Sequence, residues 1–149
     1  MTVAPPRALE ERLRDTRSRF AGDVDLWVAT AHPEDGVHLI PLSFLWDGTA
    51  FLVSTPHASA TARNLRADGR VRLSLGPTRD VVVVEGVAES AEDLDPDLGD
   101  AFAERTGFDP RQEDRPYQYF RIVPRRIQAW READELRGRD LMRDGRWLS

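Results

Sequence analysis

The sequence predicts a mainly β protein with a few helices, folded as a closed antiparallel barrel. Two tight-turn signals, Asp35-Gly36 and Asp47-Gly48, each separate two largely apolar segments and so indicate two successive hairpins. Residues 70–75 alternate strictly between polar and aliphatic side chains, which is typical of a strand with one buried face. Short strands joined by regular turns, with few helical segments, favour a barrel over a two-sheet sandwich.

The composition is that of a globular protein without cysteine. The 149 residues fit a single domain over 1–149, and the formal net charge of -5 argues against a nucleic-acid partner. The absence of cysteine excludes disulfides, zinc thiolates and thiol catalysis. No apolar run is long enough for a membrane span or for the core of a secretory signal. We therefore expect a cytoplasmic protein with no membrane partner.

The chain also contains no lysine, because all 21 basic residues are arginine. This excludes Schiff-base chemistry and leaves arginine as the basic side chain that can hold a phosphate. Complete replacement of lysine by arginine suggests a GC-rich genome, such as an actinobacterial one.

The first third of the chain predicts a helix followed by three strands. Within the N-terminal segment 1–22, Leu9, Leu13 and Phe20 have helical spacing and give one apolar stripe. The strands are predicted at 25–31, 37–46 and 50–55. Pro41 lies inside the second of these strands, and because proline lacks an N–H it requires a bulge or an unpaired edge there.

The remaining elements alternate between strands and two helices. Helices are predicted at about 59–67 and 92–106, and strands at 70–75, 80–88, 117–123 and 125–131. The first helix ends before Gly69, which suits a left-handed C-terminal turn, and Pro124 separates the last two strands. The barrel thus spans 24–131, and a charged C-terminal tail follows at 132–149. Two alternatives remain for the tail: it docks on a partner barrel, or it is a solvated and partly frayed end.

Polar side chains gather where the third strand passes into the helix at 59–67. They are Ser54, Thr55, Ser59, Thr61, Arg63 and Asn64. A helix N-terminus presents free N–H groups and a partial positive charge, and an adjacent guanidinium adds charge-assisted hydrogen bonds, so the segment suits a phosphate. Ordinary helix capping by serine and threonine is the alternative.

Four motifs, taken in order, resemble the pyridoxamine-5'-phosphate-oxidase-like family, also described as FMN-binding split β-barrels. They are D-G followed by V-x-x-x-P-x-x-F at 35–44, A-R-N-L-x-x-x-x-R-V at 62–71, V-x-V-x-G-x-A at 82–88 and R-I-Q-A-W at 126–130. The resemblance implies a six- to seven-stranded antiparallel split β-barrel. It also implies FMN or, in many actinobacterial members, the deazaflavin F-420 as cofactor, and a homodimer with the cofactor sites at the subunit interface.

The resemblance further implies which positions contact the cofactor. These are Pro41, Leu42, Ser43 and Phe44 beside the ring, and Ser54, Thr55, Ser59, Thr61, Arg63 and Asn64 around the phosphate. Trp130 is a candidate for stacking on the cofactor, with core packing or an interface as alternatives. Many members carry a lysine where this chain has Thr61. A second cation for the phosphate would come from Arg70, Arg72 or Arg79. The alternative is that these arginines simply lie on a solvent-exposed face of the protein.

The expected activity is that of a flavin/deazaflavin-dependent oxidoreductase with an unknown small, conjugated substrate. In such enzymes the cofactor carries the hydride, and the chain shows no Ser-His-Asp arrangement and no metal-ligand spacing. The catalytic residues therefore stay unassigned, and His57 is the histidine best placed to touch a ligand. The actinobacterial composition slightly favours F-420 over FMN. A non-catalytic FMN/F-420 binding or carrier protein is the alternative. A true pyridoxamine-phosphate oxidase is less favoured, because the chain has no clear second basic cluster for a substrate phosphate. A haem protein is less favoured too, because no histidine is placed as an axial ligand.

Overall fold

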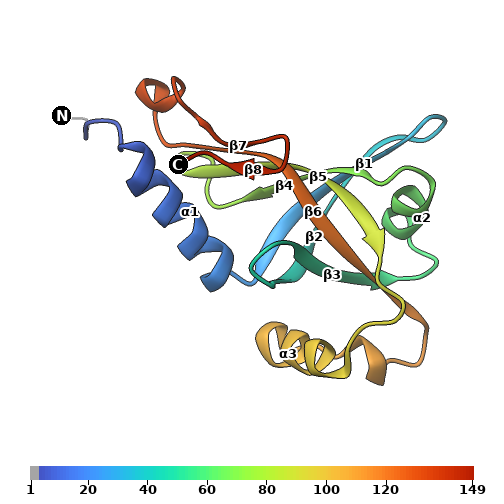
Figure 1. Cartoon of the computed structure of the whole chain (residues 1–149). Coiled ribbons are helices and arrows are strands. Elements are labelled where there is room, and N and C mark those ends of the chain that lie inside the picture. Colours follow the sequence, from blue (N-terminus) through green and yellow to red (C-terminus); the bar gives the residue numbers. More distant parts are fainter. Residues whose placement is uncertain (1–3) are drawn as a thin grey trace.

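The computed structural model describes residues 4–149 and shows a closed antiparallel barrel (Figure 1). Its strands are β1 (Asp25–His32), β2 (Gly36–Trp46), β3 (Phe51–Pro56), β4 (Arg70–Leu75), β5 (Val81–Ser90), β6 (Tyr117–Trp130), β7 (Asp140–Arg143) and β8 (Arg146–Trp147). The strand order is β3-β2-β1-β4-β5-β6, and β6 pairs with β3 to close the ring, while β7 and β8 extend from β6. The predicted antiparallel split barrel is confirmed.

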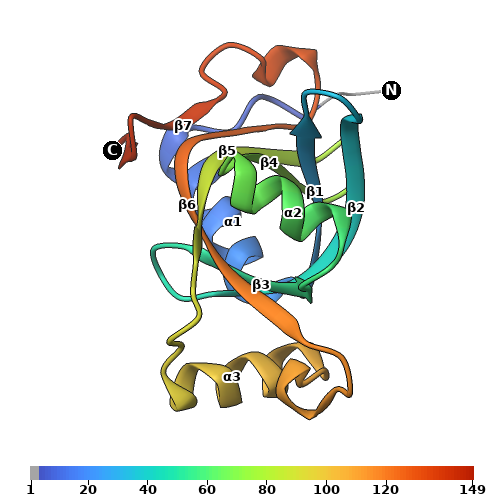
Figure 2. The same cartoon turned by 90° about the vertical axis from the view of Figure 1, so that its right-hand side faces the viewer.

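Two helices lie at the two ends of the barrel, and a third lies beside the barrel against β2 (Figure 1). They are α1 (Leu9–Gly22), α2 (Ala60–Ala67) and α3 (Pro96–Thr106), with single 3-10 turns at Pro110–Gln112 and Ala133–Glu135. Figure 2 looks at the barrel from the α2 end, with α2 in front and α1 behind. At the α1 end, Phe20 packs edge-on against Phe51, with ring centroids 4.8 Å apart, and both rings are buried.

The barrel is split between β2 and β3. Strand β2 pairs with β3 only along Phe44–Trp46, which gives three residue pairs. The preceding part of β2, residues 36–43, pairs with β1 and diverges from β3. Helix α2 contacts both strands and β1, and so lies across the divergence. The Phe44 N–H bonds the Val24 carbonyl on the β1 side at 2.8 Å. The backbone N–H groups of a strand point alternately to its two sides, so the nitrogen of Pro41, three residues before Phe44, points away from β1 to the free edge of β2. The missing N–H of Pro41 therefore costs no hydrogen bond of the sheet.

Two predicted elements have different limits in the structure. Helix α3 begins at Pro96 rather than near residue 92, because Asp95 caps it by accepting a hydrogen bond from the Asp97 N–H at 2.8 Å. The predicted strands 117–123 and 125–131 are one continuous strand, β6. The β5–β6 register shifts between Glu85 and Gly86, opposite Pro124, and this irregularity accommodates the missing N–H.

The N-terminal helix is shorter than the predicted segment 1–22. It begins at Leu9, and residues 1–3 lie outside the described part of the chain. Within residues 4–149, none of the helices combines the length and the apolar character that crossing a bilayer requires.

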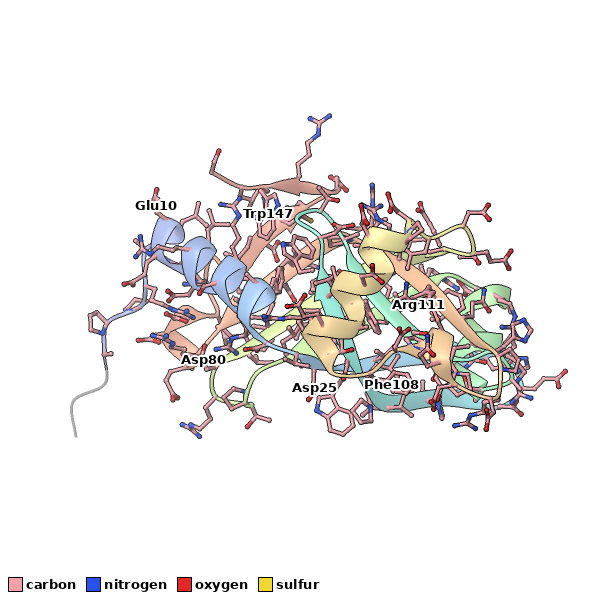
Figure 3. The ribbon with its side chains drawn as sticks, turned by 90° about the horizontal axis from the view of Figure 1, so that it is seen from below. Glu10, Asp25, Asp80, Phe108, Arg111 and Trp147 are labelled. Atoms are coloured by element: carbon pink, nitrogen blue, oxygen red, sulfur yellow. The ribbon has the colours of Figure 1, made fainter. Side chains whose placement is uncertain are left out.

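The C-terminal tail is folded onto its own barrel, so of the two alternatives for the tail the frayed end is wrong, and a contact with a partner barrel stays a prediction. Strand β7 pairs with β6 and buries Leu141 completely. The buried Arg12 guanidinium of α1 donates hydrogen bonds to the carbonyls of Ala129, Glu135 and Gly138. Trp147 lies beside α1, where the Arg17 guanidinium stands 4.4 Å from its ring centroid (Figure 3). The hairpin of β7 and β8 was not predicted from the sequence, because its strands are short and contain few apolar residues.

Candidate functional site

The start of helix α2 is anchored directly to the end of β3. Ser59 is the N-cap, and its Oγ accepts a hydrogen bond from the Ala62 N–H at 3.1 Å. The Thr55 Oγ1 lies 3.0 Å from the Ser59 Oγ, so two hydroxyls meet at this end of the helix. The first backbone N–H groups of a helix have no intrahelical acceptor, and they carry the positive end of its dipole.

A hollow of about 240 Å³ opens beside this helix start. It is lined by Pro56, His57, Ala58, Ser59, Arg115 and Pro116. The two walls come together because β3 pairs with β6 and the His57 N–H donates to the Pro116 carbonyl at 3.0 Å. The exposed Arg115 makes no ion pair within residues 4–149, and it lies 5.7 Å from the Tyr117 ring centroid. The hollow therefore combines a helix N-terminus, a hydroxyl and a guanidinium, which suits a phosphate.

Arg63 adds a second guanidinium on the same side of α2. It follows Ser59 by four residues, so the two side chains share one helix face. Arg63 is exposed and makes no ion pair with the other described residues. The structure thus brings together Thr55 and Ser59 from the sequence prediction, while Arg63 lies one turn into α2 and does not line the hollow.

Three predicted residues are used inside the protein instead. Asn64 is buried and donates from Nδ2 to the Thr30 Oγ1 at 3.0 Å, which ties α2 to β1. Thr61 is 1% exposed, and its Oγ1 has no hydrogen-bond partner among residues 4–149. Phe44 is fully buried in the barrel core, and its backbone N–H bonds the Val24 carbonyl, so the predicted contact of this residue with the ring is not supported.

Ser54 belongs to a polar cluster around Gln118, which the sequence analysis did not identify. The Ser54 Oγ donates to the Gln118 carbonyl at 3.2 Å. The side-chain amide of Gln118 accepts from Arg66 at 2.6 Å and donates to Ser90 at 3.0 Å. This cluster fixes the β3–β6 seam from which the hollow opens.

The segment of β2 expected beside the ring follows the free edge. Pro41 is exposed on the outer face, while Leu42 packs against the core. The Ser43 hydroxyl donates to the Asp25 carboxylate at 2.7 Å. A ligand along this edge would meet backbone groups and small outward side chains.

Trp130 lies far from the hollow within one chain. It ends β6, a strand of 14 residues, whereas Tyr117 beside the hollow begins it. At about 3.3 Å per residue, the two positions are about 40 Å apart along the strand.

The three arginines proposed as a second cation are all engaged by carboxylates. Arg70 pairs with Asp68 at 2.8 Å, Arg79 pairs with Glu132 at 2.9 Å, and Arg72 pairs with Glu85. Arg115, rather than any of these three, lines the hollow at the start of α2. Sequence spacing gave no signal for it, because Ser59 and Arg115 become neighbours only through the β3–β6 pairing.

Residues 4–149 contain no group of three His, Cys, Asp or Glu side chains that could hold a metal ion.

The family model of pyridoxamine 5'-phosphate oxidase matches residues 17–131. Solved structures show the same fold at low identity. A conserved hypothetical protein of Mycobacterium tuberculosis is 24% identical, with a TM-score of 0.66, and the match covers 90% of this chain and 91% of that one.

A Clostridium acetobutylicum protein related to general stress protein 26, of the pyridoxinephosphate oxidase family, is 15% identical with a TM-score of 0.66, covering 83% and 90%. An F-420 reductase is 17% identical with a TM-score of 0.63, covering 74% of this chain and 94% of that one. No curated protein matches the chain.

Proposed function

Because the chain belongs to the pyridoxamine 5'-phosphate oxidase family, we propose that it is a flavin- or deazaflavin-dependent oxidoreductase. It transfers a hydride between bound F-420 or FMN and a small conjugated substrate. The observation that carries this proposal is the hollow of about 240 Å³ at the start of α2, with Arg115 in its wall.

The hollow fits the phosphate of such a cofactor. The hydroxyls of Thr55 and Ser59 and the first N–H groups of α2 would bind the phosphate oxygens. Arg115 and Arg63 would neutralise its charge, and each charge-assisted hydrogen bond contributes about 1.5–3 kcal/mol. Two arginines thus compensate for the lysine that Thr61 replaces.

The free edge of β2 would hold the ring system. Around Pro41, every second residue of β2 turns its backbone away from β1, and this stretch is not paired with β3, so the free carbonyl and N–H groups on that side can bind the polar edge of a ring. When bound, the cofactor supplies the hydride chemistry. The side chains and backbone of this chain bind the cofactor, orient it and exclude water from one side of it.

We further propose that the protein is a homodimer with two cofactor sites at the subunit interface. Leu39, Trp27 and Val37 are 61%, 49% and 90% exposed, and the β1–β2 register places them on one outer face. Exposed apolar side chains gathered on one face indicate a protein interface. Since Trp130 is remote from the hollow of its own chain, it would contact a cofactor only from the second copy.

F-420 is the favoured cofactor, and FMN is the alternative. The lysine-free, arginine-rich composition and the structural likeness to an F-420 reductase support F-420. A non-catalytic FMN/F-420 binding or carrier protein is the competing function. The lining of the hollow favours this alternative. His57 is the one histidine that lines it, and no carboxylate does, so acid–base groups for a reaction are scarce there.

The test is a fluorescence-quenching titration of cofactor-free protein with FMN and with F-420. Tight binding of one cofactor, weakened at least tenfold in both Arg115→Gln and Arg63→Ala, would support the site. Arg79→Gln is the matched control, because Arg79 pairs with Glu132 away from the hollow. No binding of either cofactor would refute the proposal, and so would equal affinity in all variants.

A second measurement separates the enzyme from the carrier. Bound reduced cofactor is mixed with a panel of quinones and conjugated carbonyl compounds, and its oxidation is followed by absorbance. Oxidation faster than that of the free cofactor identifies an enzyme. An unchanged rate over the whole panel, with tight binding, identifies a carrier.

A further inference from the structure

His57 occupies a defined place in the hollow at the start of α2. It lies in the turn between β3 and α2, where the Ser59 N–H donates to the Pro56 carbonyl at 2.9 Å. The His57 N–H donates across the hollow's edge to the Pro116 carbonyl at 3.0 Å. These bonds fix the wall that contains His57 against the wall that contains Arg115, and both residues line the same hollow of about 240 Å³.

His57 and Arg115 are the two ionisable residues among the six that line this hollow, and no carboxylate lines it. In the described part of the chain, neither side chain forms an ion pair or a hydrogen bond with another residue. The charged residues next to them along the chain are Arg63 in α2 and Glu113 and Asp114 in the loop before Arg115, and none of these three lines the hollow. The charges of His57 and Arg115 are therefore available to an anion that enters it.

His32 is placed differently. Its Nδ1 accepts a hydrogen bond from the Glu34 N–H at 3.1 Å and lies 3.7 Å from a carboxylate oxygen of Asp35. All three residues belong to the β1–β2 turn, so the imidazole of His32 is used to form that turn. Among residues 4–149, the imidazole of His57 has no such structural partner.

The charge of the hollow depends on pH through His57. A histidine side chain changes its charge between pH 5 and 8, whereas a guanidinium stays positive. Tyr117 is the titratable side chain of β6 beside Arg115, with its ring centroid 5.7 Å from the guanidinium, and a phenol stays uncharged in this pH range. Two positive groups in one hollow repel each other unless an anion lies between them. Binding of an anion is therefore coupled to uptake of a proton by His57.

The two candidate cofactors differ in the charge of their phosphate. FMN ends in a phosphomonoester, which carries about -1.5 to -2 charges at pH 7 because its second proton leaves at about pH 6. The phosphate of F-420 is a diester and carries a single charge. In the lining of the hollow, Arg115 alone matches the charge of a diester, and Arg115 together with a protonated His57 matches that of a monoester.

We propose that His57 determines which of these phosphates the hollow prefers. In its protonated form it pairs with the second negative charge of a phosphomonoester and so favours FMN. In its neutral form it leaves Arg115 to hold a diester such as that of F-420. The inference rests on the proposed function, because it takes the hollow as the phosphate site of the cofactor. The preference for F-420 then applies at the higher pH, and FMN gains as the pH falls.

The test is a titration of the cofactor-free protein with FMN and with F-420 at pH 6 and at pH 8. At pH 6, His57→Gln should bind FMN about tenfold more weakly than the unmodified protein does, and at pH 8 the two should bind it equally. Because each comparison is made at one pH, the ionisation of the FMN phosphate itself cancels. Binding of F-420 should change by less than about threefold at either pH.

Two further variants make the test specific to the charge of His57. His57→Arg replaces the titrating charge with a permanent one, so it should bind FMN at least as tightly at pH 8 as at pH 6. His32→Gln removes a histidine that does not line the hollow, and it should bind both cofactors as the unmodified protein does. Thermal melts confirm that each variant is folded.

Proton uptake provides a second readout, which a merely structural role of His57 would not change. Calorimetry of FMN binding at pH 7, in two buffers that differ in ionisation enthalpy, measures the protons taken up with the ligand. We expect net uptake by the unmodified protein and none by His57→Gln.

The failure of this inference can be distinguished from the failure of the proposed function. Tight binding of FMN with equal affinity in His57→Gln and the unmodified protein at pH 6 would overturn the role of His57 and leave the cofactor site standing. Equal weakening of FMN and F-420 by His57→Gln would overturn it too. If neither cofactor binds at either pH, both the inference and the proposed function are refuted.

Discussion

Arg7 and Glu135, 128 positions apart in the sequence, form a buried two-pronged ion pair. The Arg7 Nη2 lies 2.7 Å from the Glu135 Oε1, and the Arg7 Nε lies 2.9 Å from the Oε2. The Arg7 backbone N–H also donates to the same carboxylate at 2.9 Å. The pair joins the segment before α1 to the turn before β7, so it connects the two ends of the described chain.

The first prediction concerns the pH dependence of stability. The hydrogen bonds from Arg7 lower the pKa of Glu135 to about 2, from an ordinary value of 4.5. A carboxylate with a lowered pKa stabilises the fold above its unfolded pKa, and this contribution disappears as the pH falls toward 2. Glu135→Gln should lower the free energy of unfolding at pH 7 by about 3 kcal/mol. Urea unfolding from pH 7 to pH 2 should show this difference shrinking below pH 4.5.

Glu132→Gln is the control for that measurement. Its partner Arg79 is exposed, and such surface pairs contribute at most about 1 kcal/mol. A difference between Glu135→Gln and the unmodified protein that stays constant down to pH 2 would contradict the assigned pKa.

The second prediction concerns the hydrogen bond that holds α2 to β1. Thr30→Val leaves the Nδ2 of buried Asn64 without its acceptor, which should cost about 1–3 kcal/mol. The double variant Thr30→Val/Asn64→Leu should be more stable than the sum of the single changes predicts, because no polar group is left unpaired. Urea unfolding of the four proteins measures the coupling. Thr78→Val, in an exposed turn, controls for the substitution itself, and strictly additive effects would contradict the prediction.

The third prediction has the opposite sign. The Oγ1 of Thr61 is buried without a partner, so Thr61→Val removes an unsatisfied group and keeps the shape of the side chain. The thermal midpoint should rise, by an amount equivalent to about 1 kcal/mol or more. Differential scanning calorimetry measures it, with Thr30→Val as the reference that falls. A lowered midpoint would show that the hydroxyl is satisfied in solution.

The fourth prediction tests the interface with a second copy. Leu39→Arg places a charge in the middle of the exposed apolar face of β1 and β2, and it should convert a dimer to a monomer. Leu136→Arg is the matched control, because Leu136 is 40% exposed at a different place on the surface. Sedimentation velocity distinguishes the two species. A chain that sediments as a monomer without any substitution would contradict the dimer.

Local signals account for the parts of the fold and site that the sequence predicted. Ser59 is recognisable as a cap because its position before a helical segment is a property of neighbouring residues. The same holds for the alternation in β4 and for the turns that define the hairpins. Pro41 predicted an edge because the missing N–H is a property of the residue alone.

The features that the sequence did not predict depend on contacts between distant segments. Arg115 lies at the site only because β6 pairs with β3. No sequence motif between Ser59 and Arg115 indicates that these two strands are neighbours. The alternation of β2 places the Phe44 side chain in the core, although its motif position suggested a ring contact. In the tail, Leu141 reaches the core through β7, which the surrounding charges obscured.

The divergence of β2 from β3 also affects how the chain resists aggregation. An unpaired strand edge presents a row of N–H and carbonyl groups to which any other extended chain can add. Along Gly36–Ser43 this row is interrupted by Pro41, whose nitrogen faces that edge without a hydrogen. Pro41 therefore has a second consequence: the free edge can bind a small ligand, but it cannot form an unbroken ladder of hydrogen bonds with the extended strand of a misfolded chain.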